Sequence, residues 1–288
     1  MSLADFLIQA LNSVQYGLLL FLLASGLTLV FGIMGVINLA HGSFYMLGAY
    51  LAYGLAPLFD SLLLAIVAGT AIAFAVGFAL EKLLFQWLYR RDHLDQVLLT
   101  FGLILIFEEL RSIVWGDDVH GVKVPAMWDW SFALTDTLSY PAYRLLISGV
   151  CLAVAAGMYW LIARTRLGMM IRAGASNREM AQALGIDINL LFAGVFALGT
   201  ALAAFSGMLA APIASVYPNM GSGILIVCFV VVVIGGIGSV RGALIASLLI
   251  GFVDTFGKVF APQLAGAAIY IVMAAMLLWR PEGLFSKA

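Results

Sequence analysis

The apolar residues of this chain gather in runs long enough to cross a lipid bilayer, a passage that takes about 20 mostly apolar residues in a helix. Nine runs approach or reach that length: 14–34, 39–55, 62–85, 97–114, 143–162, 190–211, 224–237, 243–256 and 265–279. A backbone in lipid must satisfy its own hydrogen bonds, and these runs lack the alternation of a barrel strand. The sequence therefore predicts an all-α, polytopic membrane bundle of eight to nine spans with broken or re-entrant helices.

The composition leaves no room for a separate soluble domain. Of the 288 residues, 64% are hydrophobic and 10% are charged, whereas soluble domains carry roughly 25% charged residues. We therefore expect one membrane domain over residues 1–288. The net charge of -1 and the scattered basic residues exclude the basic stripe that a nucleic-acid partner requires.

The distribution of Lys and Arg predicts the orientation, because basic residues near span ends stay in the cytoplasm. Segment 164–189 carries Arg164, Arg166, Arg172 and Arg178, so we expect it to form a cytoplasmic loop. Segment 115–143 has Lys123 as its only Lys or Arg and is expected outside. The C-terminus, beyond Arg280, is expected in the cytoplasm. Nine crossings would put the N-terminus outside, and eight would make one short run re-entrant or a broken half-helix.

The cytoplasmic loop contains a capping box, in which Ser176 and Glu179 satisfy each other's exposed backbone donors. A helix is predicted over 177–184, because Gly185 suits a left-handed C-terminal cap. So short a helix is marginal alone in water and must dock its apolar face on another surface. That face holds Met180, Ala183 and Leu184. The surface on which this helix docks is either formed by the chain's own span ends or is a groove on a cytosolic partner.

Glycines and polar residues interrupt the apolar sequence over 32–43. Helix breaks at membrane depth usually line a cavity. The candidates for a translocation path are Gly35, Asn38, His41, Gly42 and Ser43. A structural role for His41, bonded to a neighbouring carbonyl, is the alternative.

Small residues recur every four positions along the run 190–211. They are Gly199, Ala203, Gly207 and Ala211. Such a seam permits close approach of helices where lipid supplies no hydrophobic drive, and we interpret it as a packing surface.

Ionisable groups near spans are functional candidates because they are costly in hydrocarbon. Most of them lie close enough to a span end to pair, as Glu81 could with Lys82 and Glu108 with Arg111. No cluster has metal-ligand or catalytic-triad spacing, so we expect neither a catalytic residue nor a metal site.

The stretches 26–32, 35–42 and 45–50 together closely resemble the high-affinity branched-chain amino acid permease family, in the shorter of its two permease types. The stretches 172–185, 235–242 and 279–285 resemble the same family, so the likeness covers nearly the whole chain.

The resemblance implies the permease subunit of an ATP-binding-cassette importer for Leu, Ile and Val in the bacterial inner membrane. Its partners would be a second related permease, two cytosolic ATPase subunits and a periplasmic binding protein. ATP and Mg would be bound by the partners, and no cofactor by this chain. The coupling residues to the ATPase would be Ser176, Glu179, Met180, Ala181, Leu184 and Gly185.

Two other functions stay open. Related permeases carry urea or short amides. An ion-coupled secondary transporter would explain the composition equally well, with Glu108, Glu109 or Asp254 as the coupling carboxylate.

Overall fold

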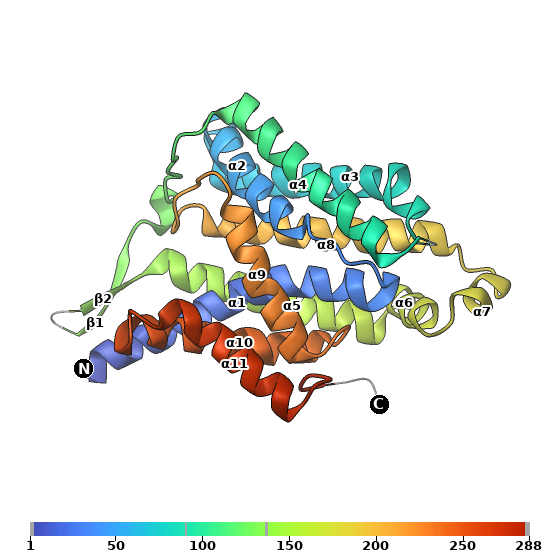
Figure 1. Cartoon of the computed structure of the whole chain (residues 1–288). Coiled ribbons are helices and arrows are strands. Elements are labelled where there is room, and N and C mark those ends of the chain that lie inside the picture. Colours follow the sequence, from blue (N-terminus) through green and yellow to red (C-terminus); the bar gives the residue numbers. More distant parts are fainter. Residues whose placement is uncertain (1–2, 90, 136–137, 286–288) are drawn as a thin grey trace.

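The fold is a helical bundle, seen in a computed structural model that describes residues 3–89, 91–135 and 138–285. The long helices run roughly side by side (Figure 1). They are α1 (Leu3–Met34), α2 (His41–Phe59), α3 (Leu62–Leu83), α4 (His93–Trp115), α5 (Ala142–Arg164), α8 (Ile188–Ala210), α9 (Met220–Gly235), α10 (Val240–Phe260) and α11 (Ala265–Trp279). Each of the nine predicted apolar runs overlaps one of these helices, so the polytopic helical architecture is confirmed.

Two short helices, two single turns and one hairpin complete the described elements. They are α6 (Arg166–Ser176), α7 (Arg178–Ala183), η1 (Phe85–Trp87), η2 (Ala126–Trp128), β1 (Ser131–Thr135) and β2 (Leu138–Pro141). The strands pair antiparallel, with Ser131 opposite Pro141. The all-α expectation missed this hairpin because a lone pair of strands in a polar loop carries no apolar run.

By length and apolar composition, five of the described helices could cross a membrane: α1, α3 with η1, α5, α8 and α10. Helices α9 and α11 are apolar but shorter. The count of eight to nine spans therefore stays a prediction.

Polar residues set where several helices begin. The side chains of Ser61, Thr165, Asp187 and Ser239 accept hydrogen bonds from backbone N–H groups in the first turns of α3, α6, α8 and α10. Such caps satisfy donors that a helix start leaves free.

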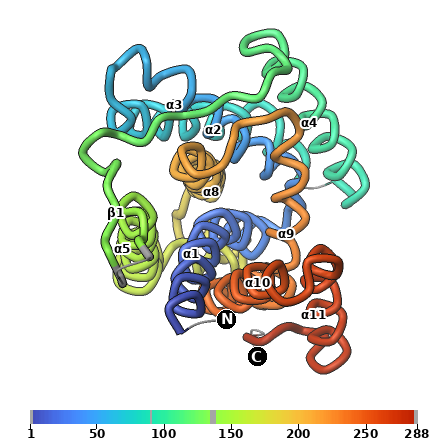
Figure 2. Tube along the Cα trace, turned by 90° about the vertical axis from the view of Figure 1, so that its left-hand side faces the viewer, coloured from blue at the N-terminus to red at the C-terminus, as the bar shows by residue number. Residues whose placement is uncertain are grey.

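Helices α1 and α8 occupy the interior of the bundle, and the other long helices surround them (Figure 2). They cross closely where Gly26 faces Gly199, since a Cβ on Gly26 would lie 2.5 Å from the Gly199 carbonyl oxygen. On α8, Gly207 meets the backbone of α2 at Tyr45, and Ala203 is fully buried. The predicted seam on α8 thus faces α1 and α2.

The chain breaks between α1 and α2. Gly35 has a φ of 67° after the last turn of α1, and helix α2 begins only at His41. The His41 side chain then reaches back to the Leu23 carbonyl, about 16 Å from the end of α1 at 1.5 Å per residue. The chain therefore re-enters the bundle before α2 starts, as the predicted helix break requires.

Candidate functional site

Helix α7 lies at the end of the bundle opposite the β1–β2 hairpin (Figure 1). The Asn177 Oδ1 caps it by accepting the Met180 N–H at 2.9 Å. The predicted cap at Ser176 is therefore wrong by one residue. Ser176 is the last residue of α6, and the extended backbone that a cap requires falls on Asn177 instead.

The other end of α7 is closed by Gly185, which has a φ of 85°. The Gly185 N–H donates to the Gln182 carbonyl at 2.9 Å, and the Ile186 N–H donates to the Ala181 carbonyl at 3.1 Å. These two bonds form a Schellman motif, which satisfies carbonyls that a helix end would leave free. Gly185 thus takes the left-handed conformation predicted for it.

Most of the apolar surface of α7 is uncovered in the described chain. Ala181 is buried and docks the helix, whereas the side chains of Met180 and Leu184 are 58% and 75% exposed. Ala183 and Glu179 are also exposed. The face predicted to dock therefore points away from the chain's own span ends.

Arg178, the first residue of α7, connects this helix to the bundle. Its guanidinium donates to the carbonyl oxygens of Met34 and Ile33 at the end of α1. The Arg178 Cζ also lies 5.0 Å from the ring centroid of Phe192 on α8. A cation at a helix C-terminus complements the partial negative charge of the free carbonyls. Arg178 thereby joins α7 to both interior helices.

A cleft of about 480 Å³ runs beside α7. Its wall combines η1, the segment after it and the start of α8. The lining residues are Gln86, Trp87, Tyr89, Arg178, Glu179, Gln182, Ile188, Asn189 and Phe192. Trp87 is 72% exposed at its rim. The exposed apolar side chains of Trp87, Met180 and Leu184 lie beside the polar residues of this cleft. We call this combined area the α7 surface.

The turn between α9 and α10 and the C-terminal segment pack near the end of α1. Gly238, in the turn between α9 and α10, packs against Gly32 of α1. The C-terminal segment binds this turn, since the Leu284 N–H donates to the Ile234 carbonyl at 2.8 Å. Three of the stretches that carry the family resemblance, 26–32, 235–242 and 279–285, therefore meet in one region of the fold.

Of the predicted path residues, Gly35 is exposed, and Asn38, His41, Gly42 and Ser43 are buried. Asn38 and His41 are fully buried, and the His41 Nε2 lies 2.9 Å from the Leu23 carbonyl oxygen. The side-chain oxygen and nitrogen of Asn38 have no hydrogen-bond partner within the described residues. Gly42 packs on Gly221 of α9. None of the predicted path residues lines the cleft beside α7 or the cavity described next, so their role in translocation stays a prediction.

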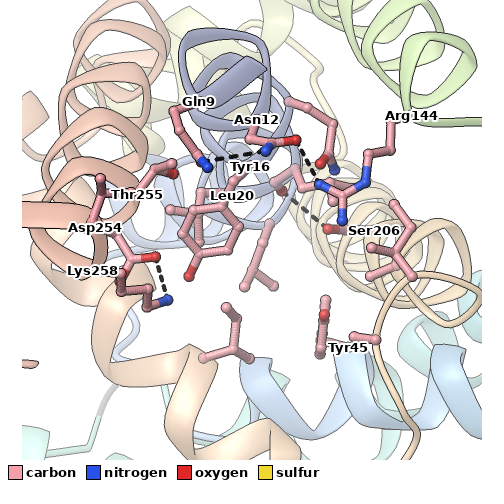
Figure 3. A pocket seen from close by; sticks show the side chains of 18 residues that line it. Gln9, Asn12, Tyr16, Leu20, Tyr45, Arg144, Ser206, Asp254, Thr255 and Lys258 are labelled. Carbon is pink, nitrogen blue, oxygen red and sulfur yellow. Dashed lines mark hydrogen bonds and ion pairs between the residues drawn. The ribbon is translucent and has the colours of Figure 1, made fainter. Parts of the chain in front are cut away.

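A second cavity, of about 540 Å³, opens among α1, α2, α5, α8, α9 and α10 (Figure 3). We call it the polar cavity. Asp254 and Lys258 of α10 form an ion pair of 2.6 Å on one side. On the other side, Arg144 of α5 donates to the Asn12 Oδ1 at 2.7 Å. Tyr16 and Leu20 lie between these groups in Figure 3.

Sequence reasoning missed the polar cavity because its charged groups come from helices more than a hundred residues apart. Two signals pointed toward it. Gln9, Asn12 and Tyr16 recur at helical spacing on α1, and Asp254 and Lys258 stand four residues apart on α10.

The two ion pairs predicted near span ends have different outcomes in the structure. The predicted pair of Glu108 and Arg111 is confirmed at 3.4 Å. The pairing of Glu81 with Lys82 is wrong: adjacent helical residues do not face each other, and the buried Glu81 accepts the Tyr89 hydroxyl at 2.5 Å. Within residues 3–89, 91–135 and 138–285, no three His, Cys, Asp or Glu side chains are grouped so as to hold a metal ion.

These features define a polytopic helical membrane protein with a capped helix exposed at one end and a polar cavity toward the other. Residues 9–279 match the family described as the permease component of branched-chain amino acid transport systems. The chain belongs to that family.

Three named relatives illustrate the match. The permease protein BraD of a high-affinity branched-chain amino acid transport system in Pseudomonas aeruginosa is 31% identical, over 98% of this chain and 96% of that protein. LivH of Escherichia coli is 27% identical over the same shares. LivM of Escherichia coli is 25% identical over 91% of this chain and 67% of its own length. The structure of PsaBC from Streptococcus pneumoniae in complex with Fab matches 93% of this chain and 89% of that one, with 14% identity and a TM-score of 0.49.

Proposed function

We propose that this chain is the membrane-spanning permease subunit of an ATP-binding-cassette importer that carries leucine, isoleucine and valine across a bacterial inner membrane. Its family membership and the names of BraD and LivH support this substrate class. The chain itself binds no cofactor and has no catalytic residue. ATP and Mg are bound by the partner subunits.

The proposed topology has nine crossings, with the N-terminus outside and the C-terminus in the cytoplasm. Helix α7 and the loop between α4 and α5 lie at opposite ends of the bundle (Figure 1), which agrees with a cytoplasmic segment 164–189. Counting α1, α2, α3, α4, α5, α8, α9, α10 and α11 as crossings satisfies both assignments.

The proposed assembly contains four further subunits. A second, related permease of the LivM type pairs with this chain; LivM of Escherichia coli resembles this chain over 91% of the chain's length. Two cytosolic ATPase subunits power transport, and a periplasmic binding protein delivers the amino acid.

The exposed apolar face of α7 is the observation that carries the proposal. A six-residue helix gains little stability alone, yet caps at both ends hold it with Met180 and Leu184 turned outward. That arrangement suits insertion into a groove of the ATPase.

In this proposal, the free energy of ATP hydrolysis reaches the translocation path through the contact between α7 and the ATPase. A partner shifts a conformational equilibrium only if it binds one state better than the other. Arg178 offers the connection, because its bonds tie α7 to the end of α1. Movement of the ATPase groove would therefore be transmitted to the two interior helices.

Charge reversal at Glu179 tests the proposal. Glu179 is exposed and lines the cleft beside α7, so Glu179→Lys is expected to abolish leucine uptake while membrane insertion and ATP hydrolysis persist. Asp118→Lys, the same reversal on the exposed outer loop, is the matched control and should retain uptake. Undiminished uptake in Glu179→Lys would contradict the proposal.

The same assay separates the alternatives. Uptake that survives ATP depletion and collapses with an ion gradient would indicate a secondary transporter. Two of its candidate carboxylates, Glu108 and Asp254, are already in ion pairs, which disfavours that role. Competition by urea or short amides, without competition by leucine, would indicate the other permease class.

A further inference from the structure

A groove with a volume of about 600 Å³ runs along α1 between α5 and α10, and we call it the α5–α10 groove. Figure 2 shows α1 between these two helices. The floor of the groove is the α1 face from Phe21 to Ile33, which corresponds to about 18 Å at 1.5 Å per residue. One leaflet contributes about 15 Å to the hydrocarbon core of a bilayer, which is about 30 Å thick. The groove therefore has the length of an acyl chain in one leaflet.

The groove is open at the surface of the described chain. Leu152 and Tyr159, on its α5 wall, are 54% and 50% exposed. Its floor and walls belong to α1, α5 and α10, three of the helices that are long and apolar enough to cross a membrane. Lipid surrounds such helices wherever no other protein covers them. An open apolar groove between them therefore meets acyl chains.

The charged residues of the groove are two arginines at one of its ends. Arg172 comes from α6, and Arg241 comes from the first turn of α10. The Arg241 guanidinium donates to the Tyr159 hydroxyl at 3.2 Å, and the Arg172 guanidinium donates to the Ile162 carbonyl. Since Tyr159 and Ile162 are one helical turn apart on α5, both guanidiniums stand at the same end of the groove.

Neither arginine is neutralised within residues 3–89, 91–135 and 138–285. The two acceptors just named, a phenol oxygen and a peptide carbonyl, are neutral, and the cations of the ion pairs in these ranges are Arg111 and Lys258. Among the described residues that line the groove, none is Asp or Glu. A guanidinium binds a phosphate through two parallel N–H groups. The groove therefore joins an apolar channel to an uncompensated positive end.

The positive end of the groove lies on the same side of the membrane as α7. Arg172 stands on α6, directly before α7, in the segment 164–189 that is proposed to be cytoplasmic. Gly238, three residues before Arg241, packs against Gly32 near the end of α1. The headgroups of the inner leaflet lie at this level, and anionic lipids of that leaflet attract basic residues.

We infer that the α5–α10 groove binds an anionic phospholipid of the inner leaflet, with its phosphate on Arg241 and one acyl chain along the floor formed by α1. Arg172 adds positive charge beside the headgroup. A zwitterionic headgroup fits less well, because its ammonium group is repelled by the second arginine. The inference goes beyond the proposed function and takes from it only the cytoplasmic placement of segment 164–189.

Native mass spectrometry tests the assignment, because it identifies and counts bound lipids by mass. The sample is the purified full-length chain with the subunits that co-purify with it. The probes are phosphatidylglycerol and phosphatidylcholine with the same palmitoyl and oleoyl chains, and glycerol 3-phosphate, which carries a phosphate without acyl chains. The unmodified protein should bind phosphatidylglycerol about tenfold more tightly than phosphatidylcholine. It should not bind glycerol 3-phosphate at the same concentrations.

Substitutions in the groove separate its charge from its shape. Arg241→Gln should remove most of the preference for phosphatidylglycerol, and Arg172→Gln should reduce that preference by a smaller factor. Arg241→Lys keeps the charge and should retain part of the preference, which distinguishes a charge contact from a folding defect. Ala156→Phe places a ring on the exposed α5 wall. This variant should weaken the binding of both lipids by a similar factor.

Arg280→Gln is the matched control. The Arg280 Cζ also lies over an aromatic ring, 5.6 Å from the Trp279 centroid, and the segment after it binds the turn before α10. Arg280 does not line the groove, so the lipid preference should stay unchanged in this variant.

Three results would overturn the inference: equal affinity of the unmodified protein for the two lipids, binding of glycerol 3-phosphate as tight as that of phosphatidylglycerol, or the same loss of preference in Arg280→Gln as in Arg241→Gln. Leucine uptake by the complete importer is measured separately. Intact uptake beside any of these results would reject the lipid site and leave the proposed function standing.

Discussion

Arg178, at the start of α7, donates hydrogen bonds to the carbonyl oxygen of Met34, at the end of α1. Few other polar contacts join α7 to the described bundle. We therefore expect the Arg178 bonds to couple the position of α7 to that of α1. A helix held by one buried alanine and one arginine can move as a unit with the helix to which it is tied.

The first prediction concerns this link. Arg178→Ala removes charge-assisted bonds of about 1.5–3 kcal/mol and should lower leucine uptake roughly tenfold, while ATP hydrolysis continues. Uptake and hydrolysis in reconstituted vesicles measure both quantities. Arg166→Ala, at an exposed position nearby, should change neither quantity. If this control lost uptake as well, the loss in Arg178→Ala would reflect the removal of a positive charge and not the contact with α1.

The second prediction concerns the close crossing of α1 and α8. Gly26→Ala places a methyl group 2.5 Å from the Gly199 carbonyl oxygen, and such overpacking costs about 1–3 kcal/mol. The apparent Tm of the purified chain should fall. Gly194→Ala, on α8 as Gly199 is but facing open space, should keep or raise the Tm because alanine favours helix. Equal behaviour of the two variants would contradict this packing.

The third prediction is a pH dependence on the outer side. Arg111 donates to the Asp117 carboxylate at 2.6 Å, and this bond, aided by Ser112, holds the pKa of Asp117 below its ordinary value of 3.8. A lowered pKa in the folded state contributes stability that is present above the unfolded pKa and is lost as the pH falls through the folded one.

Asp117→Asn should therefore lower the Tm at neutral pH, and the difference from the unmodified chain should shrink below about pH 4 and vanish once the pH is below the lowered pKa of Asp117. Melting curves between neutral and acidic pH measure it. Asp118→Asn, at an exposed neighbour, is the control. A difference that persists unchanged into acid would exclude this ion pair as its cause.

The fourth prediction is the orientation. The native Cys151 and Cys228 are buried, so single added cysteines can be labelled against a low background. Asp118→Cys should react with a membrane-impermeant thiol reagent in intact cells. Gln182→Cys, on α7, should react only after the membrane is opened. The reverse pattern would invert the proposed topology.

Much of the fold follows from local sequence. The nine apolar runs become helices because each lies in a long stretch with no competing pattern, and Gly185 caps α7 because a left-handed turn favours glycine. The helix cap was misplaced by one residue because Ser176 and Asn177 are both good caps. Only the end of α6 decides between them.

The site was less predictable. The exposure of Met180 and Leu184 depends on how α7 docks, which Ala181 and Arg178 determine through tertiary contacts. Arg144 and Asp254 meet in one cavity only because α5 and α10 both pack near α1. No local pattern of the sequence reports that meeting.

The contact between α7 and the ATPase is tested most directly by a photo-crosslinking residue at Met180 in the complete importer. The exposed Met180 side chain should crosslink to the nucleotide-hydrolysing subunit, whereas the same residue at Asp118 should not. Crosslinks from position 180 that stay within the permease, or that never reach an ATPase, would contradict the coupling role of α7.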